Sequence, residues 1–304
     1  MIEIKTADEI ELMRHAGRIT AAALAAVRDA AAVGVRLDAL DEVAADIIAD
    51  AGAEALFLGY QPGSAPTPYP GVTCISVNDA VVHGIPGRYR LAAGDLVSVD
   101  CGARYRGWSG DAALSFIVGE HPDPRVTRSD EALIATTRAA LDAGVAAARP
   151  GARLGDVAHA IGRVARAAGY GLMANHGGHG IGREMHEAPH VPNEGRPGRG
   201  LVLRPGLVLA LEPMLITGGT DAYVEDPDGW TLRTADGSRA AHIEHTVAVT
   251  EHGPRSSPSS RERGRCAEPP RGVLRSVPTS WRGGELGWSR TCSWSASTTT
   301  APRS

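Results

Sequence analysis

The order of its predicted elements constrains the fold of this chain more than any other feature. Helices are predicted over residues 6–31 and 37–51, and short β-rich runs that carry acidic residues follow them. Two further helices, near residues 129–148 and 153–168, are again followed by apolar strands that contain acids. Because the same order occurs twice, it is typical of a diverged duplication. We therefore expect an α+β domain in which two helical pairs pack on one sheet.

Local signals mark these elements. Thr6 and Glu9 have the spacing of a capping box, which predicts the start of the first helix. The second helix ends before Gly52, a common residue just past a helix C-terminus. The predicted strands are the apolar runs TCISVN, DLVSVDCGA, DAALSFIVG, GLVLALEPML, GWTLRT and AHIEHTVAVT.

Composition limits the class of protein. A chain of 304 residues with 43% hydrophobic residues is long enough for one substantial domain with a core. The net charge of -4 argues against a general nucleic-acid binder. No apolar run reaches the length of a membrane span, and the N-terminus lacks a signal-peptide core. The four cysteines have neither metal-ribbon spacing nor the pattern of a disulfide framework. These features predict a cytoplasmic enzyme or binding protein.

The composition changes near residue 253. Residues 253–304 are rich in Ser, Arg, Pro and Thr and have no hydrophobic period, which is typical of a disordered tail. A functional basic arm is the alternative, because arginine outnumbers the acids in this segment. Our hypothesis for its origin is a reading-frame change in GC-rich coding sequence. The predicted catalytic domain is thus residues 1–252.

Two aspartates give the first chemical signal. Asp100 ends the run LVSVD, and Asp111 begins DAALSFIVG. A turn centred on Tyr105 and Arg106 would place the two aspartates directly opposite each other, with Cβ atoms about 4.5–5.5 Å apart. Like charges at that distance on a buried sheet repel, and a bound cation removes the repulsion. The alternative is two unrelated aspartates at exposed strand ends.

Histidines and two further acids add to this signal. The segment NHGGHGIGREMHEAPHVPNEG resembles a glycine-rich loop that could hold a metal or a phosphate, and its histidines are His176, His179, His186 and His190. Glu212 and Glu244 lie in apolar strands, where an unpaired carboxylate is costly to bury. Either each faces solvent on an edge strand, or these acids converge on a metal.

Four carboxylates and one histidine form a hard, oxygen-rich ligand set. Such a set suits Mn²⁺, Fe²⁺ or Co²⁺, and Zn²⁺ is also compatible. Two divalent ions would balance the charge of four carboxylates. A dinuclear site of this kind can hold a water between the metals and lower its pKa, which provides a hydroxide nucleophile near neutral pH.

Several strings, taken in order, resemble the type 1 methionine aminopeptidases, a pita-bread metallopeptidase family. They are CISVNDAVVHGIP, GDLVSVDCGARYRGWSGD, HGGHGIGREMHEAP, LALEPM, DGWTLRT and EHTVAVT, and the resemblance covers residues 2–252. It implies pseudo-twofold halves, each helix, helix and strands, around a central antiparallel sheet. It also implies removal of the initiator methionine from nascent proteins when the second residue is small.

The resemblance implies a role for each ligand. Asp111 and Glu244 would bridge two divalent ions, Co²⁺, Mn²⁺, Fe²⁺ or Zn²⁺. Asp100 would serve one ion, while His179 and Glu212 serve the other. The implied partners are nascent polypeptide N-termini near the ribosome, with no membrane or specific nucleic acid, and the implied oligomeric state is a monomer.

The resemblance also implies catalytic and substrate-binding residues. His83 would contact the scissile amide, and His186 would bind the methionine carbonyl oxygen and stabilise the developing oxyanion. Glu212 would transfer a proton to or from the nucleophilic water. A methionine thioether packs well against aromatic rings and sulfur. The implied pocket is Tyr69, Cys74 and Trp230, with Tyr60, Phe57 and Met185 as further candidates.

The sequence departs from the family at several points. The segment QPGSAPTPY, residues 61–69, is longer than in the best-known bacterial enzymes, so the resemblance does not determine the structure of the pocket rim. Gly102 stands where many relatives have a hydroxyl residue, so a weak auxiliary cation site there would be lost. His242 and Ile243 replace the more usual glutamine and aromatic residue. Two rival functions are a proline-specific pita-bread peptidase and a non-catalytic relative that binds peptides, ribosomes or nucleic acid.

Overall fold

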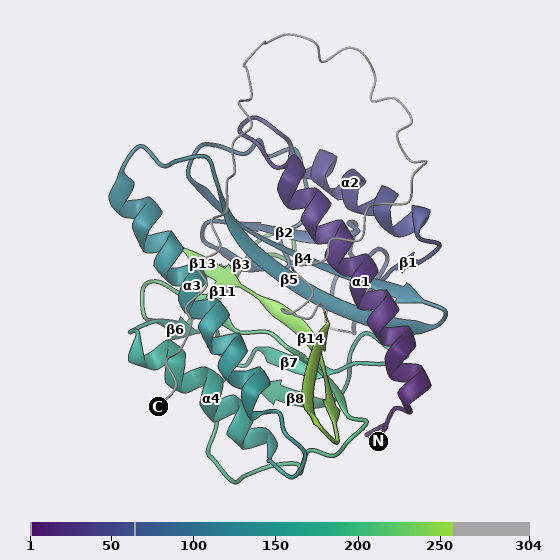
Figure 1. The fold of residues 1–304 in the computed structure, drawn as a ribbon. Coiled ribbons are helices and arrows are strands. Elements are labelled where there is room, and N and C mark those ends of the chain that lie inside the picture. The colour runs from purple at the N-terminus through teal and green to yellow at the C-terminus, as the bar shows by residue number, and fades with distance from the viewer. Residues whose placement is uncertain (1, 64, 258–304) are drawn as a thin grey trace, which may run out of the picture. The chain divides into compact units, whose positions relative to one another are not determined.

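The computed structural model describes residues 2–63 and 65–257 (Figure 1). Its helices are α1 (Ala7–Ala30), α2 (Leu37–Asp50), α3 (Pro124–Ala147) and α4 (Leu154–Ala167). The capping box that begins α1 is present, since the Thr6 side chain accepts from the Glu9 N–H and the Glu9 side chain accepts from the Thr6 N–H. Helix α3 begins earlier than predicted, because Asp123 caps it and Pro124 is suited to a first helical turn.

Fifteen strands form the rest of the regular secondary structure in the described residues. They are β1 (Glu54–Ala55), β2 (Thr73–Val77), β3 (Ala80–Val82), β4 (Asp95–Tyr105), β5 (Trp108–Val118), β6 (Gly171–Leu172), β7 (Gly177–Gly180), β8 (Glu187–Pro192), β9 (Val208–Leu211), β10 (Met214–Ile216), β11 (Tyr223–Glu225), β12 (Leu232–Thr234), β13 (Ala240–His242), β14 (Glu244–Thr250) and β15 (Gly253–Ser257).

An antiparallel sheet organises the domain. Its nine strands follow the order β1-β4-β5-β14-β9-β7-β8, with β2 paired to β4 and β15 paired to β14. Two three-stranded sheets, β13-β10-β6 and β11-β12-β3, adjoin it. The predicted α+β pita-bread fold, with its two helical pairs and central antiparallel sheet, is confirmed. Within the described residues, no helix is both long and apolar enough to cross a bilayer.

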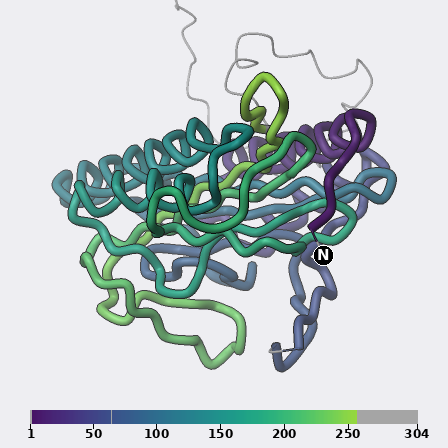
Figure 2. Tube along the Cα trace, turned by 90° about the horizontal axis from the view of Figure 1, so that it is seen from below, coloured from purple at the N-terminus to yellow at the C-terminus, as the bar shows by residue number. Residues whose placement is uncertain are grey.

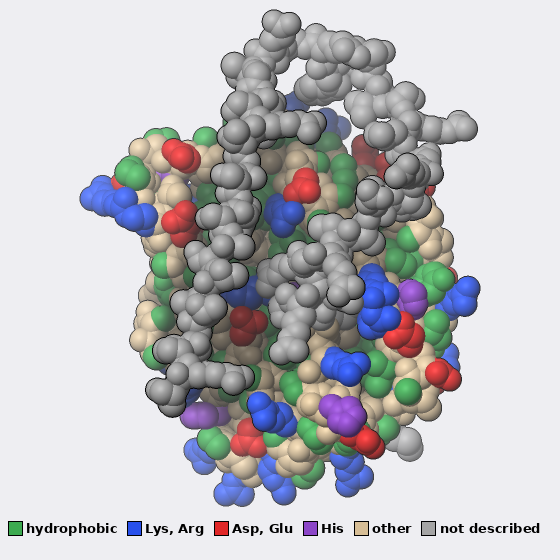
Figure 3. All heavy atoms as spheres, viewed as in Figure 1, with side chains coloured by type: hydrophobic (Ala, Val, Ile, Leu, Met, Phe, Trp, Pro, Cys, Tyr) green, Lys and Arg blue, Asp and Glu red, His purple; other side chains and the backbone are tan. Residues whose placement is uncertain are grey.

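The helices cover one face of the nine-stranded sheet. Val99 and Cys101 of β4 pack against α1 and α2, and Val247 of β14 packs in the core beneath α3 and α4. Since side chains alternate along a strand, Asp100 and Glu244 point to the opposite face. Figure 2 shows the helices on one side of the sheet, while the segments between β1 and β2 and between β10 and β12 extend on the other side. Basic and acidic side chains are interspersed over the described part of the helical face (Figure 3).

Two of the predicted strands are interrupted, which corrects the expected continuous runs. The run 206–215 divides into β9 and β10 at Glu212–Pro213, and the run 241–250 divides into β13 and β14 at Ile243. Pro213 has no N–H with which to continue a ladder. The Ile243 N–H donates to the Pro213 carbonyl at 3.4 Å, so the two breaks lie beside each other. The first run thus leaves the large sheet for a small one at Glu212, and the second run enters the large sheet from the same small one just before Glu244.

Strand β15 corrects the predicted end of the domain. Residues 253–257, predicted to be tail, pair with β14 from Thr246↔Ser257 to Thr250↔Gly253. The domain therefore continues past residue 252. The rest of the predicted tail, 258–304, lies outside the described residues.

A chain that stops after Ser257 is expected to keep the unfolding free energy of the full chain. A chain that stops after residue 252 loses the β14–β15 ladder, and at about 1 kcal/mol per net hydrogen bond it should lose about 2 kcal/mol or more. Urea unfolding of both truncations measures the difference. Equal stability of the two truncations would show that β15 contributes nothing to the fold.

Candidate metal centre and adjoining pocket

The hairpin of β4 and β5 presents both aspartates on the sheet face away from the helices. Asp100 pairs with Ala113 and Asp111 pairs with Gly102, so the predicted direct opposition of the two aspartates is wrong. They are diagonal neighbours on one face, a relation that still lets side chains meet. The reason is the turn, which is centred on Arg106 and Gly107, both with positive φ, and not on the preceding pair of residues.

The strand register places further groups in the same row. Cys74 of β2 pairs with Asp100, and Ala113 of β5 pairs with both Asp100 and Glu244. Cross-strand partners share a face of the sheet, so Cys74, Asp100 and Glu244 all point to the side away from the helices. Because the Ala113 side chain between them is small, the carboxylates of Asp100 and Glu244 have room above it.

The next row of cross-strand neighbours on this face contains Asp111 and His179. Thr246 of β14 accepts a hydrogen bond from the Asp111 N–H at 3.0 Å and donates to the Asp111 carbonyl at 2.8 Å, which holds β5 against β14. Ala210 of β9 pairs with both Thr246 and His179 of β7. Asp111 of β5 and His179 of β7, with β14 and β9 between their strands, therefore project onto the same face.

The glycines around His179 have a role that differs from the one predicted. A Cβ atom on Gly178 would lie 2.0 Å from the Ala210 carbonyl oxygen, and one on Gly180 would lie 2.2 Å from the Ala188 carbonyl oxygen. Residues 177–180 thus form strand β7, which lies between β8 and β9, and not a loop around a ligand. Its glycines allow the close approach of three backbones.

His179 has the hydrogen bonding of a metal ligand. Its Nδ1 lies 2.9 Å from the Gly180 carbonyl oxygen, to which only a protonated Nδ1 can donate. The Nε2 lone pair then faces the acids, 3.6 Å from Glu212 Oε1. Burial lowers the pKa of His179 to about 3, so the ring is neutral at physiological pH, as a ligand must be.

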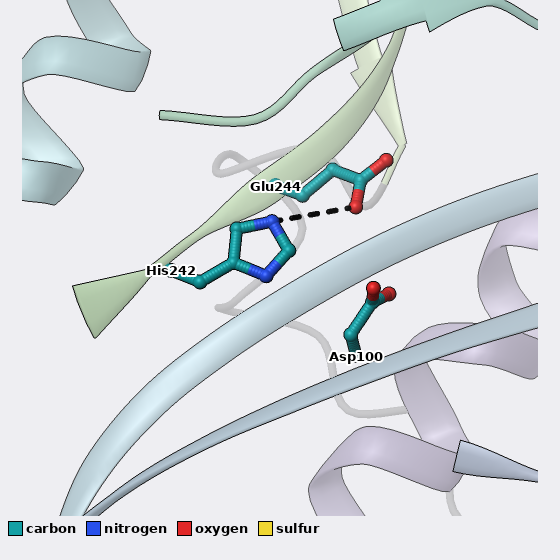
Figure 4. Close-up of side chains that lie close together, drawn as sticks. All are labelled: Asp100, His242 and Glu244. Carbon is teal, nitrogen blue, oxygen red and sulfur yellow. Dashed lines mark ion pairs between the residues drawn. The ribbon is translucent and has the colours of Figure 1, made fainter. Parts of the chain in front are cut away.

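Two groups of side chains could each hold an ion. One is Asp111, His179 and Glu244, and the other is Asp100, His242 and Glu244, with ligand atoms in each group within 4.8 Å of one another. Figure 4 shows the second group, with the imidazole and both carboxylates directed at one another. Glu212 lies beside both groups. Its Oε1 is 3.6 Å from His179 Nε2, and its Oε2 is 3.7 Å from His242 Nε2.

All five ligands predicted from the resemblance therefore lie together. His242 was noted in the sequence only as a departure from the family. Its position two residues before Glu244, in an apolar run, was the signal that could have identified it.

The electrostatics of the cluster favour bound cations. Burial, followed by the charges of neighbouring acids, raises the pKa values of Asp100, Glu212 and Glu244, and burial raises that of Asp111. Within the described part of the chain, Asp100 Oδ1, Asp111 Oδ1 and Glu244 Oε1 are buried without a hydrogen-bond partner. Unpaired buried carboxylates are costly, and divalent cations offset that cost. The residues present thus fit divalent metal binding.

A cavity of about 230 Å³ opens beside the cluster. Its polar lining is the predicted set, His83, Asp100, Asp111, His179, His186, Glu212 and Glu244, and its apolar lining is Phe57, Tyr60, Pro62, Tyr69, Cys74, Met185 and Trp230. A larger cavity of about 780 Å³ lies beside α1 and β15 and contains none of the predicted site residues. The smaller cavity is the candidate site because the reactive groups converge there.

The apolar wall is held by specific contacts. The Tyr69 ring meets the edge of Trp230 at a centroid distance of 5.0 Å, and its hydroxyl donates to the Gly84 carbonyl at 2.8 Å. Trp230 Nε1 donates to the Thr67 carbonyl at 3.1 Å. Burial raises the pKa of the Cys74 thiol, which keeps it protonated and makes it an apolar contact.

The segment 61–69, which is longer than in the best-known relatives, is part of this wall. Pro62 lines the cavity, and Thr67 anchors Trp230. Pro66 lies so close to Gly229 that a Cβ there would be 2.5 Å from its Cγ. The longer segment therefore closes one side of the pocket.

The two predicted catalytic histidines line the same cavity. His83 has a left-handed backbone with φ of 60°, and burial lowers its pKa to about 4. His186 lies at the solvent-exposed side, with Nδ1 3.0 Å from the Tyr60 hydroxyl and its ring 4.3 Å from that of His179. Partial burial of the ring also lowers the pKa of His186. Both rings are thus neutral and can donate one N–H to a substrate.

Trp230→Ala is expected to weaken binding of a methionine side chain with little effect on the metals. Removing the indole opens the wall against which Tyr69 packs, and loss of an aromatic wall should raise KM more than it lowers kcat. Steady-state kinetics with a methionyl peptide measure both constants. An unchanged KM would place the methionine side chain elsewhere.

A buried ion pair supports the segment that carries His186. Lys5 Nζ lies 2.5 Å from Glu187 Oε2, and the Lys5 side chain is only 1% exposed. Glu187 Oε1 accepts from the Glu184 N–H at 3.3 Å, so the pair ties the N-terminus to the residues around His186. Lys5→Met leaves Glu187 unpaired and is expected to cost about 3 kcal/mol in urea unfolding. Adding Glu187→Gln to that variant should recover part of the loss; if it recovers none, the pair is not the cause.

Comparison with known proteins identifies the family. A family model for metallopeptidase family M24 matches residues 11–251. The match spans most of the chain, so this chain belongs to metallopeptidase family M24.

Individual relatives place it more narrowly. Methionine aminopeptidase 1 of Mycobacterium tuberculosis is 53% identical over 258 residues, which are 83% of this chain and 92% of that protein. The crystal structure of methionine aminopeptidase from Thermotoga maritima has a TM-score of 0.79 and 41% identity, and the match covers 86% of this chain and 100% of that chain. Prolidase from Pyrococcus furiosus, at 24% identity, a TM-score of 0.66 and coverage of 84% and 65%, shares the fold alone. Within family M24 the chain thus groups with the methionine aminopeptidases, as its sequence strings predict.

Proposed function

We propose that this enzyme removes N-terminal methionine by hydrolysis at two divalent ions held by Asp100, Asp111, His179, Glu212 and Glu244. The chain is a metal-dependent aminopeptidase of the methionine-specific kind. The observation that carries the proposal is the convergence of the carboxylate and imidazole cluster with an apolar cavity of about 230 Å³. Such a site can position a terminal methionine side chain beside hydrolytic groups.

The proposed roles follow from position. When two divalent ions are bound, the chemistry they supply is a water whose pKa is lowered toward neutrality. Glu212, whose carboxylate lies beside both ligand groups, takes up the proton of this water. His186, at the cavity mouth, donates an N–H to the methionine carbonyl oxygen as charge develops on it. His83, across the cavity near Trp230, contacts the scissile amide.

The proposed substrates are nascent polypeptides whose second residue is small. Pro62 and Trp230 belong to the apolar lining of the cavity, and its volume of about 230 Å³ supports a pocket for the methionine side chain. We propose that the enzyme acts as a monomer in the cytoplasm, near the ribosome. The ligand set supports Co²⁺, Mn²⁺, Fe²⁺ or Zn²⁺ as the bound metal.

The two rival functions have less support. A prolidase shares the fold alone with this chain, whereas the methionine aminopeptidases are similar to it in sequence along most of their length. A non-catalytic relative would have lost part of the ligand set, and here all five groups line one cavity.

A peptide assay tests the proposal. Metal-free protein is loaded with Co²⁺ or Mn²⁺ and incubated with Met-Ala-Ser, with Met-Trp-Ser and with Ala-Pro. Free methionine is expected from the first peptide only. Release of alanine from Ala-Pro without cleavage of Met-Ala-Ser would favour the proline-specific alternative. Cleavage of no peptide by metal-loaded protein would favour a binding protein.

A further inference from the structure

His242, the last residue of β13, is a buried polar group outside the set of five ligands in the proposed function. It is 2% exposed, and its Nε2 has no hydrogen-bond partner among the residues that the structure describes. The nearest acids, Glu212 Oε2 and Glu244 Oε2, lie at 3.7 and 3.8 Å, beyond hydrogen-bond distance. A buried nitrogen without a partner costs about 1–3 kcal/mol of stability. A cation bound between this nitrogen and the two acids would offset that cost.

The backbone of His242 is fixed from two directions. Strand β13 pairs it with Met214 of β10. Its N–H donates to the Ser115 hydroxyl at 3.1 Å, and the Ser115 hydroxyl donates to its carbonyl at 2.8 Å. The Ser98 hydroxyl lies 2.8 Å from that of Ser115 and adds β4 to the clamp. This clamp determines where the imidazole projects, and Figure 4 shows the ring directed at Glu244, with the Asp100 carboxylate facing it.

The spacing of these three side chains suits one ion. Single ligand atoms of Asp100, His242 and Glu244 lie within 4.8 Å of one another. Two ligand atoms on opposite sides of an ion are about 4.2 Å apart when each lies about 2.1 Å from it. Three atoms this close together lie at most about 2.8 Å from a common centre, so shifts of about 0.7 Å or less bring all three to a bonding distance of about 2.1 Å. The same spacing is found in the group of Asp111, His179 and Glu244.

We propose that His242 is a ligand of the ion held by Asp100, so that each of the two metal positions has one imidazole nitrogen. The inference rests on the proposed two-metal site and adds a sixth ligand to it. In the set implied by the family resemblance, the position at Asp100 has oxygen ligands alone. A nitrogen there changes which metal the position prefers, because imidazole suits iron, nickel and zinc, whereas carboxylate and water suit manganese.

His242→Gln is the sharpest substitution, because it keeps a polar side chain of similar length and replaces the imidazole with an amide. The variant is expected to bind Co²⁺ at the position of Asp100 about 10- to 100-fold more weakly, the range found when groups supporting a metal site are removed. Binding of Mn²⁺ at that position should weaken less, since Mn²⁺ accepts oxygen ligands readily. His159→Gln, an exposed change on α4, is the matched control and should bind both metals as the unchanged protein does.

A direct count of bound imidazoles completes the test. The full chain, labelled with ¹⁵N-histidine and loaded with two equivalents of Co²⁺, should show two strongly shifted, solvent-exchangeable imidazole N–H resonances in the proton NMR spectrum. His179→Ala should remove one and His242→Gln the other. Because the unchanged protein itself gives the count, the test stands even if His242→Gln does not fold.

The outcomes separate the inference from the proposed function. A protein that binds two Co²⁺ ions, releases methionine and shows one shifted imidazole N–H would overturn the role of His242 alone. If both Co²⁺ ions bind equally tightly to the unchanged protein and to His242→Gln, the role of His242 is likewise overturned. A protein that binds no divalent metal would overturn both proposals.

Discussion

Replacing Asp111 with asparagine is expected to reduce methionine release to the rate of metal-free protein. Asp111 projects between β4 and β14 beside Asp100 and Glu244, and it belongs to the group that includes His179. The change removes one negative charge from a buried acidic cluster while keeping the size of the side chain. The remaining groups should bind metal more weakly, and without bound metal no water of lowered pKa is available.

The measurement pairs kcat on Met-Ala-Ser with the metal content after dialysis. Asp142→Asn, an exposed change on α3, is the matched control and should release methionine at the unchanged rate. His179→Ala should behave like Asp111→Asn, since it removes the imidazole from the same group. If Asp111→Asn or His179→Ala keeps the unchanged rate, the ligand assignment is wrong.

Replacing His186 with alanine is expected to lower turnover by about 10²–10³, the typical effect of removing an oxyanion donor. Unlike Asp111, His186 is in neither group that could hold an ion, so the bound metal should stay the same. Its neutral ring lies at the cavity mouth, where it can donate to the carbonyl oxygen of a bound methionine. The loss should therefore fall on kcat more than on KM.

Two controls make this result specific. Tyr60→Phe removes only the hydroxyl that lies 3.0 Å from His186 Nδ1, and it should lower kcat less than His186→Ala does. His159→Ala changes an exposed histidine on α4 and should have no effect. Loss of metal from the His186→Ala protein would point instead to a role as a ligand.

Local sequence signals predicted the helices and several strands because their causes are local. The capping box at Thr6 and Glu9 acts within one turn, and it begins α1 as predicted. The start of α3 was predicted too late because an aspartate cap followed by proline, at Asp123 and Pro124, outweighed the apolar periodicity.

Features that depend on pairing between distant segments could not be predicted in this way. The register of Asp100 and Asp111 depends on the conformation of the turn, and a turn one residue further along changes every partner. The strand breaks beside Glu212 and Glu244 depend on how β10 and β13 leave the large sheet together. The place of β15 depends on its ladder with β14, which the polar composition of the segment does not reveal.

The sequence by itself determined the chemistry of this enzyme. Residue type and strand context pointed to the four acids and a metal-ligating histidine, the family resemblance added His83, His186 and the apolar set, and the structure brings all of them to one cavity. Only the tertiary structure decided how they meet. It placed the acids on the face away from the helices, made Pro62 a wall of the pocket, and directed His242 at the acids. The physical reason is that a side chain's chemistry belongs to its own residue, whereas its position depends on backbone pairing with strands far away in the chain.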